Sequence, residues 1–301
     1  MPDARTPLGL AQRLGRMGPH EIYTRLRQSA SSRRDELRYR MGLPAAQPAL
    51  GGKTAPGQFF FEPADVAGLA RAWAARSPAE VARVVDRARR IASHRFTLLG
   101  YRDLDFGQPI DWHRDPVHGV HAPLIPWRRI SFLDVRVVGD HKIVWELSRH
   151  QHLVTLARAF LFTGEQQYLD EAIAQWSDWQ QRNPYPLGVN WCSTLEVAFR
   201  TLSWIWMEQF LGANAPAAFR AQLAAAIGHG AFHVSRYLST YFAPNTHLLG
   251  EAVALLFAGS LHTEFRDAAR WREQGWTLVL EQARAQVRED GFHFEQSVYY
   301  H

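Results

Sequence analysis

The stretch APNTHLLGEA, residues 243–252, places an amide and an imidazole at the start of an apolar helix. Asn245 fits the N-cap position, where its side chain bonds the first turn, and its other role would be to face a ligand. His247 lies in the first turn, where the helix dipole disfavours added positive charge. A neutral imidazole there suits hydrogen bonding or proton abstraction, and Glu251, four residues on, is placed to orient it.

The stretch DGFHFEQSVYYH, residues 290–301, is the most chemically loaded segment of the chain. Phe292 and Phe294 are expected to be apolar anchors. His293 and Glu295 alternate with them, so one set should face inward and the other outward. The segment ends on three further side chains that can exchange protons, Tyr299, Tyr300 and His301. Because a solvated tail is seldom so aromatic, this segment is predicted to belong to a site.

The motif WELSRHQHL lies within one helix predicted over residues 144–164, which ends at a glycine. In the structural interpretation Arg149 pairs with the nearby Glu146 along this helix. In the functional interpretation Arg149, His150 and His152 line a cleft, with Arg149 and His152 on one side of the helix.

The motif GVNWCSTLEVAFR is predicted to be a loop that leads into a helix. Asn190 and Trp191 precede the helix N-terminus and are predicted to line a cleft. Ser193 and Glu196 have the spacing of a capping box. Glu196 and Arg200 are four residues apart, in the order that favours an ion pair within a helix.

These motifs lie at the ends of predicted helices. Helices are expected at 19–40 and 63–93, and within the second range Ser77, Pro78 and Glu80 have the spacing of a capping box that starts a helix. The segment 96–142 is expected to be a long ordered crossing with short extended pieces. From residue 144 to 290 apolar residues recur three and four apart in helix after helix. The short loops predict antiparallel hairpins, so the fold class is all-α, an incomplete (α/α) toroid or barrel. The expected division is an N-terminal helix and linker over 1–60 and a toroid domain over 61–301.

Composition narrows the function class. The 301 residues are 47% hydrophobic and 21% charged with a net charge of +5, which is typical of a globular protein and mildly favours an anionic partner. No Lys/Arg run resembles a nucleic-acid arm, and no segment has the ~20 apolar residues of a membrane helix. Nucleotide-binding glycine motifs and GxSxG are absent, and the fourteen histidines lack a tight metal-binding spacing. We therefore predict no cofactor, metal, nucleic-acid partner or membrane partner.

Taken together, the motifs resemble the N-terminal domain of the heparinase II/III group of polysaccharide lyases. The resemblance is carried, in chain order, by WELSRHQHL, the TG of FLFTGEQQYL, the pair Asn183–Pro184, GVNWCSTLEVAFR, PNTHLLGEA and DGFHFEQSVYYH, and it spans residues 95–301. It implies an (α/α) toroid followed by a large β-sandwich domain. Because no such domain follows in this sequence, the chain is expected to be part of a longer protein.

The resemblance also implies a reaction, the β-elimination of a uronic-acid-containing polysaccharide that is heparan sulfate-like or alginate-like. Asn245 and His247 would neutralise the C5 carboxylate. Tyr300 would act as acid, base or both, with Tyr299 as its rival. Thr246 separates Asn245 from His247, which leaves open which of the two contacts the carboxylate. A further histidine would come from the sandwich domain, so the chain alone is expected to be inactive.

The remaining predicted site residues would bind substrate; they are Arg149, His150, His152, Asn190, Trp191, Glu251 and Glu295. One alternative is an α/α-barrel glycoside hydrolase, which needs two carboxylates across the cleft, Glu251 with Glu295 or Asp290. Another is a non-catalytic glycan-binding or assembly module. The resemblance suggests a periplasmic protein, although the first residues lack the apolar core of a signal peptide. The sequence leaves the oligomeric state open.

Overall fold

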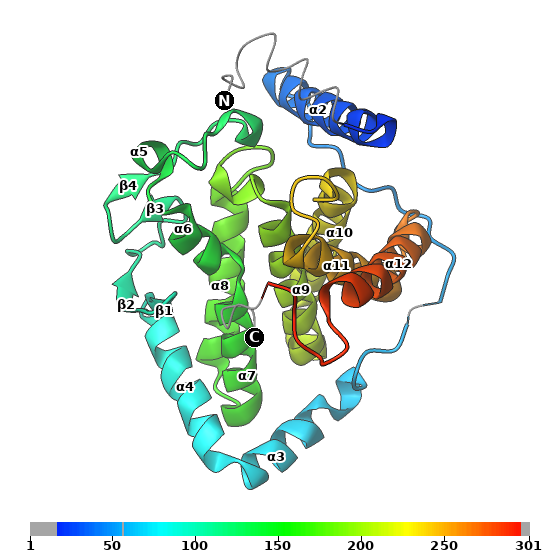
Figure 1. The fold of residues 1–301 in the computed structure, drawn as a ribbon. Coiled ribbons are helices and arrows are strands. Elements are labelled where there is room, and N and C mark those ends of the chain that lie inside the picture. Colours follow the sequence, from blue (N-terminus) through cyan, green and yellow to red (C-terminus); the bar gives the residue numbers. More distant parts are fainter. Residues whose placement is uncertain (1–16, 56, 296–301) are drawn as a thin grey trace. The chain divides into compact units, whose positions relative to one another are not determined.

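The computed structural model describes residues 17–55 and 57–295 of the chain (Figure 1). The chain divides between Ala46 and Gln47 into two compact units. The first contains helix α2 (Pro19–Arg40), which has the predicted bounds. Proline is suited to the first helical position because its missing N–H would have no partner there. Within the described ranges, no helix is both long enough and apolar enough to cross a membrane.

The second unit is built from helices that pack in pairs (Figure 1). They are α3 (Val66–Arg76), α4 (Pro78–Ala92), α6 (His141–Ser148), α7 (Gln151–Thr163), α8 (Gln166–Arg182), α9 (Thr194–Leu211), α10 (Ala217–Tyr237), α11 (Thr246–Leu261) and α12 (Ala268–Gln286), with short 3-10 turns η1 (Pro63–Asp65), η3 (Val189–Trp191) and η4 (Gly212–Asn214). Helix α9 packs against α7, α10 and α11, and α11 packs against α12. The prediction of an all-α, incomplete (α/α) toroid is confirmed.

Two glycines bring α11 and α12 into close contact. A Cβ added at Gly275 would lie 2.5 Å from the backbone nitrogen of Leu256, and one added at Gly259 would overlap the backbone of Arg272. A side chain at either position would therefore push the two helices apart. This tight hairpin holds α11, which has Asn245 as its N-cap and His247 in its first turn.

Residues 95–140 form the crossing that was predicted over 96–142, with short extended pieces. Strand β1 (Arg95–Leu98) pairs antiparallel with β2 (Tyr101–Asp105), and β3 (Arg114–Asp115) pairs with β4 (Val120–His121). The turn η2 (Trp127–Arg129) and the short helix α5 (Val135–Val138) follow. Asp115 is fully buried and accepts hydrogen bonds from the backbone nitrogens of Val117 and Asp140. These bonds favour its charged form, so its pKa is lowered despite burial, and they fix the crossing to the start of α6.

The prediction of a single helix over 144–164 is wrong, because the helical conformation is interrupted between α6 and α7. His150 adopts a left-handed conformation with φ of 60°. Its ring is fully buried, and its Nδ1 accepts from the indole nitrogen of Trp204 at 2.8 Å. A tertiary contact therefore outweighs the helical pattern. As a result, Arg149 and His152 do not share the face of one helix.

The helical range predicted over 63–93 contains η1, α3 and α4, and α4 begins directly after Ser77, where the sequence predicts a helix start. Ser77 and Ser193 do precede helices, but neither side chain caps the helix that follows. Glu196, the expected partner in the second capping box, is instead bound to Arg149. The helix starts were predicted correctly, and the capping boxes were not.

Candidate active site

Asn245 uses the two ends of its side-chain amide for different purposes. Its Oδ1 accepts from the backbone nitrogen of His247 at 3.2 Å, so it is the N-cap of α11. Its Nδ2 donates to Oε1 of Glu295 at 2.7 Å. Because the cap fixes the oxygen toward the helix, the donating nitrogen must face away from it. The half-buried amide is thus a fixed donor, and the group it meets in this structure is a carboxylate.

The segment that ends at Glu295 folds back on the C-terminal end of α12. Gly291, with φ of 84°, makes the turn, and Phe294 donates its backbone N–H to the carbonyl of Gln286 at 2.8 Å. The expected alternation is present, but the polar side chains face inward and the aromatic ones outward. Phe292 and Phe294 are 56% and 42% exposed, while His293 and Glu295 are half-buried. The prediction that the two phenylalanines are anchors is wrong. Tyr299, Tyr300 and His301 lie outside the described residues.

His247 is half-buried beside charged groups that come from other elements. Burial lowers its pKa, and Arg149 lowers it further, while Glu196 and Glu295 partly oppose the shift. The imidazole is therefore neutral at neutral pH, as the position at a helix N-terminus predicts. The carboxylates that act on His247 come from α9 and from the terminal segment, so these elements meet near the start of α11.

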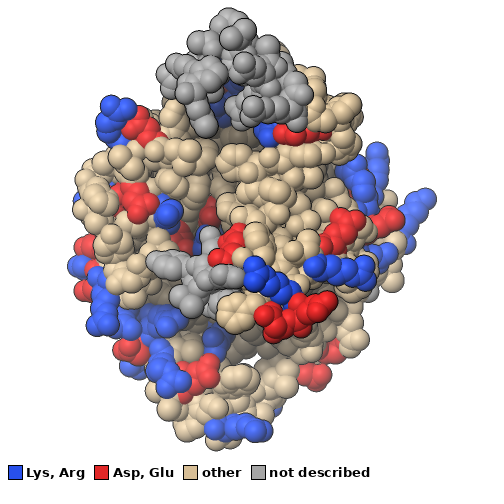
Figure 2. All heavy atoms as spheres, viewed as in Figure 1, with Lys and Arg blue, Asp and Glu red and all other residues tan. Residues whose placement is uncertain are grey.

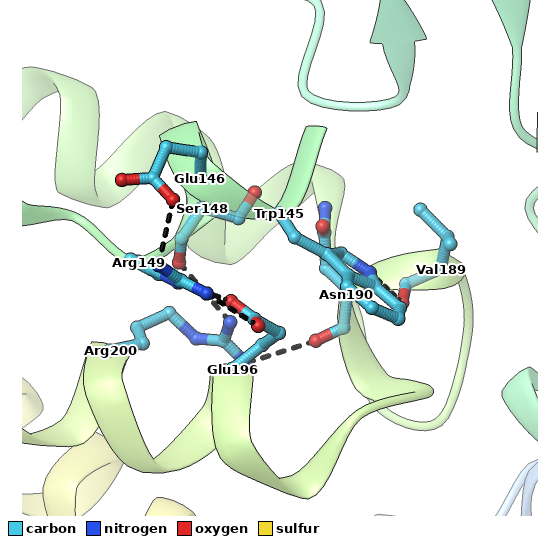
Figure 3. A network of polar contacts seen from close by, with 8 residues as sticks. All are labelled: Trp145, Glu146, Ser148, Arg149, Val189, Asn190, Glu196 and Arg200. Carbon is cyan, nitrogen blue, oxygen red and sulfur yellow. Dashed lines mark hydrogen bonds and ion pairs between the residues drawn. The ribbon is translucent and has the colours of Figure 1, made fainter. Parts of the chain in front are cut away.

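Arg149 is held between two carboxylates at the break between α6 and α7 (Figure 3). Its Nε and Nη2 donate to the two oxygens of Glu196 at 2.6 and 3.0 Å, and its Nη1 donates to Glu146 at 2.7 Å. Its guanidinium also lies 4.9 Å from the ring centroid of Phe199. The structural interpretation, an Arg149–Glu146 pair, is confirmed. Because Arg149 is already neutralised by two acids, it is not a free cation for an anionic ligand.

Arg200 does not pair with Glu196 as the spacing predicted. It is fully buried, and its two terminal nitrogens each donate at 3.2 Å to a carbonyl, one of Ser148 and one of Asn190 (Figure 3). Its guanidinium lies 4.3 Å from the ring centroid of Trp179 and 5.0 Å from that of Trp191. Burial lowers its pKa to about 9, so it remains charged at neutral pH. Arg200 thus joins the end of α6 to the loop before α9.

Asn190 and Trp191 are interior residues of that loop, 0% and 5% exposed. Nδ2 of Asn190 donates to Oδ1 of Asn183 at 2.8 Å and to the carbonyl of Trp112 at 3.1 Å. The indole of Trp191 donates to the carbonyl of Asn183 at 3.2 Å. The prediction that they line a cleft is corrected, because neither reaches a surface that a polysaccharide could occupy. Their bonds hold the loop that Arg200 connects to α6.

His150 and Glu251 are also fully buried, so neither can touch a sugar chain in this structure. Glu251 accepts from the backbone nitrogen of Ser239 at 2.7 Å and from its hydroxyl at 2.6 Å. Ser239 begins the loop that leads to Asn245. Glu251 therefore positions this loop. The prediction that it orients His247 is wrong. Because Glu251 is buried, it cannot be one of the two carboxylates that a glycoside hydrolase needs across its cleft.

Glu251→Gln is expected to leave the loop intact and to remove a pH dependence of stability. Burial raises the pKa of Glu251 to about 8, although the bonds from Ser239 oppose the shift. The folded protein then keeps a proton that the unfolded chain releases above pH ~4.5, so stability falls as pH rises from there toward 8. Glutamine imitates the protonated form. The free energy of unfolding of wild type, relative to the variant, should fall by roughly 2–4 kcal/mol between pH 5 and pH 8.5 in urea titrations.

Glu251→Ala is the matched control, since it removes the bonds to Ser239 as well as the proton. It should destabilise the protein at both pH values. A wild-type protein and a Glu251→Gln variant that respond to pH in the same way would contradict the raised pKa of Glu251.

Sequence reasoning missed the partners that organise the site. Glu196 was expected to serve its own helix, yet its carboxylate binds Arg149 across elements. Ser239 gave no signal, because only the fold brings it to Glu251. A visible clue to Glu196 is its place between Leu195 and Val197, since an acid in an apolar run is seldom buried unpaired. In the described part of the chain, no three His, Cys, Asp or Glu side chains are grouped to hold a metal ion.

Comparison with known sequences gives a family. The family described as Heparinase II/III N-terminus matches residues 71–301. A heparin-sulfate lyase of Pedobacter heparinus is 30% identical over 240 residues, which make up 75% of this chain and 33% of that protein. A heparin-sulfate lyase of Bacteroides stercoris is 26% identical over 226 residues, which make up 68% of this chain and 31% of that protein. The chain spans about a third of the length of these curated relatives.

Solved structures agree with this assignment. The heparan sulfate lyase HepC from Pedobacter heparinus superimposes with a TM-score of 0.55 at 28% identity, covering 72% of this chain and 31% of that chain. A heparinase III structure superimposes with a TM-score of 0.56 at 20% identity, covering 72% and 32%, and at that identity the likeness speaks for the fold alone. Since the family match covers most of its length, the chain belongs to the heparinase II/III family and corresponds to the N-terminal region of that family.

Proposed function

We propose that this chain carries the carboxylate-binding part of a polysaccharide lyase that cleaves a heparan sulfate-like chain by β-elimination. The observation that carries the proposal is the hydrogen bond from Nδ2 of Asn245 to a carboxylate, that of Glu295, at 2.7 Å. A uronate carboxylate presents the same oxygen atoms as Glu295. The names of the relatives, heparin-sulfate lyases, support this substrate class.

The reaction needs three groups, and we assign the first to residues that the structure describes. The C5 proton of a uronate is weakly acidic while the carboxylate is ionised, so a donor must stabilise the charge that moves onto the carboxylate. Asn245 is a fixed donor, and His247, neutral and beside it, is a second hydrogen-bonding group. The N–H of an amide stabilises an enolate-like charge by hydrogen bonding without transferring its proton, which suits Asn245 to this role.

The other two needs are a base for the C5 proton and an acid for the departing O4. We assign both to Tyr300, with Tyr299 as the alternative; they follow Glu295 by only five and four residues in the sequence. A phenol has an unperturbed pKa near ~10, so nearby donors or cations must lower it. We further propose that groups outside this chain complete the site, since the chain aligns with only 33% of the relative from Pedobacter heparinus.

The test is the ultraviolet absorbance of the unsaturated uronate that β-elimination creates. The full-length protein is incubated with heparan sulfate and, separately, with alginate. We expect product from heparan sulfate, and we expect Tyr300→Phe to abolish it if Tyr300 is the acid and base. Retention of activity by Tyr300→Phe together with its loss in Tyr299→Phe would assign the role to Tyr299. No unsaturated product from any uronate polymer would overturn the proposal.

A further inference from the structure

A basic pocket lies on the second unit, apart from Asn245, where α4, β1 and the first turn of α7 meet. Its volume is about 260 Å³, and its polar lining includes Arg87, Arg90, Arg95, Gln151 and His152. Figure 2 shows Lys and Arg side chains gathered over α4 and the β1–β2 hairpin, at the lower left of the view. Ligand sites for drug-sized molecules are typically ~300–1,000 Å³, so this pocket suits one charged sugar unit and not a longer segment.

The local structure explains why the three arginines face one place. Arg87 and Arg90 are three residues apart on α4 and therefore lie on the same face of the helix. In β1 the alternation buries Phe96 and exposes Arg95 and Thr97. Helix α4 packs against both β1 and α7, which brings these exposed side chains to the same pocket.

The electrostatics of the pocket favour an anion. The lining includes three guanidinium groups and a single carboxylate, that of Glu146, which Arg149 already binds at 2.7 Å. Arg90 and Arg95 pair with Asp86 and Asp105 at about 3 Å, but these pairs are well exposed and easily exchanged. Among the residues that the structure describes, Arg87 has no hydrogen-bonded or ion-paired partner.

Two further features point the same way. Gln151 and His152 form the first turn of α7, whose positive dipole end favours anions. The residue before them, His150, bonds to Trp204 and does not cap this helix. Burial lowers the pKa of His152 to about 3, so its ring is neutral and lines the pocket as a hydrogen-bonding group.

The pocket is connected to the candidate active site through one chain of contacts. Glu146 lines the pocket and binds Arg149, and Arg149 binds Glu196, whose charge acts on His247. We propose that the pocket is an accessory subsite that binds an oxyanion substituent, sulfate or carboxylate, of the same acidic polysaccharide. The identity of the ligand rests on the proposed function, but the existence of an oxyanion site does not.

The test measures binding to size-matched hexasaccharides of heparan sulfate, one sulfated and one unsulfated, with equal uronate content. Binding is measured by calorimetry on the Tyr300→Phe background, so that turnover does not consume the ligand. The variant is Arg87→Gln with Arg90→Gln. The matched control is Arg83→Gln with Arg89→Gln, which removes the same charge from α4 at positions that do not line the pocket.

We expect the pocket variant to bind the sulfated hexasaccharide about tenfold more weakly than the control variant does. Loss confined to the sulfated ligand assigns sulfate to the pocket, and equal loss for both ligands assigns carboxylate. Equal affinities of the pocket variant and the control variant would overturn the proposal. If no unsaturated product forms in the activity test while the arginine pair still governs binding, the proposed function fails and the pocket stands.

Discussion

Replacing Asn245 by aspartate should remove most of the proposed lyase activity of the full-length protein while leaving α11 in place. An aspartate oxygen can still accept from the backbone nitrogen of His247, so the helix cap is kept. The donating amide is exchanged for a second oxygen, which faces Glu295 and, in the proposed complex, the substrate carboxylate. Loss of one donor to a developing oxyanion costs about 10²–10³ in kcat, and like-charge repulsion adds to this. The rate of unsaturated-uronate formation measures the effect.

Asn245→Ser separates the two causes of that loss. Serine can also cap the helix, but it adds no charge and lacks the amide donor. Its activity should lie between those of wild type and Asn245→Asp, with a thermal stability close to wild type. Near-normal rates in both variants would show that Asn245 serves only as a helix cap.

Replacing Arg200 by alanine should lower the free energy of unfolding by about 3–5 kcal/mol, the range of large losses in a core. The change opens a cavity between Trp179 and Trp191 and leaves the carbonyls of Ser148 and Asn190 without their donor. Each buried polar group left unpaired costs about 1–3 kcal/mol. Urea denaturation followed by tryptophan fluorescence measures the loss, since the indoles surround the mutated position.

Arg200→Met tests how much of this loss comes from packing. Methionine fills much of the volume but donates no hydrogen bond, and it also relieves the cost of burying a charge. We expect its destabilisation to be smaller than that of Arg200→Ala. A change below about 1 kcal/mol in the alanine variant would mean that the surroundings close over the gap and that the two carbonyls find other donors.

The fold was predictable because it follows from local patterns. The apolar period of three and four, together with short loops, predicted the helices and their hairpin arrangement. The break at His150 was not predictable, since it depends on a bond to Trp204, fifty-four residues away. Local capping signals at Ser77 and Ser193 marked helix starts correctly, although neither side chain makes the capping bond.

The site was predictable in part. The helix start at Asn245 was predicted correctly, and the acid that meets Asn245, Glu295, was among the predicted residues; their roles in a reaction stay predictions. Residue spacing failed to predict the ion pair of Glu196, because Arg149 on another element competes with Arg200 on the same helix. Arg149 and Glu196 form a two-point contact, which is stronger than a single contact between residues four apart on a helix surface.

The bond between Asn245 and Glu295 means that the amide already has an intramolecular ligand. A tethered carboxylate acts at an effective concentration that can reach the millimolar range, so a free monovalent acid of equal affinity must exceed that range to displace it. Acetate or a single uronic acid should therefore be a poor inhibitor. A polymer that is held at several points at once gains avidity, and it can displace Glu295 where an isolated carboxylate cannot.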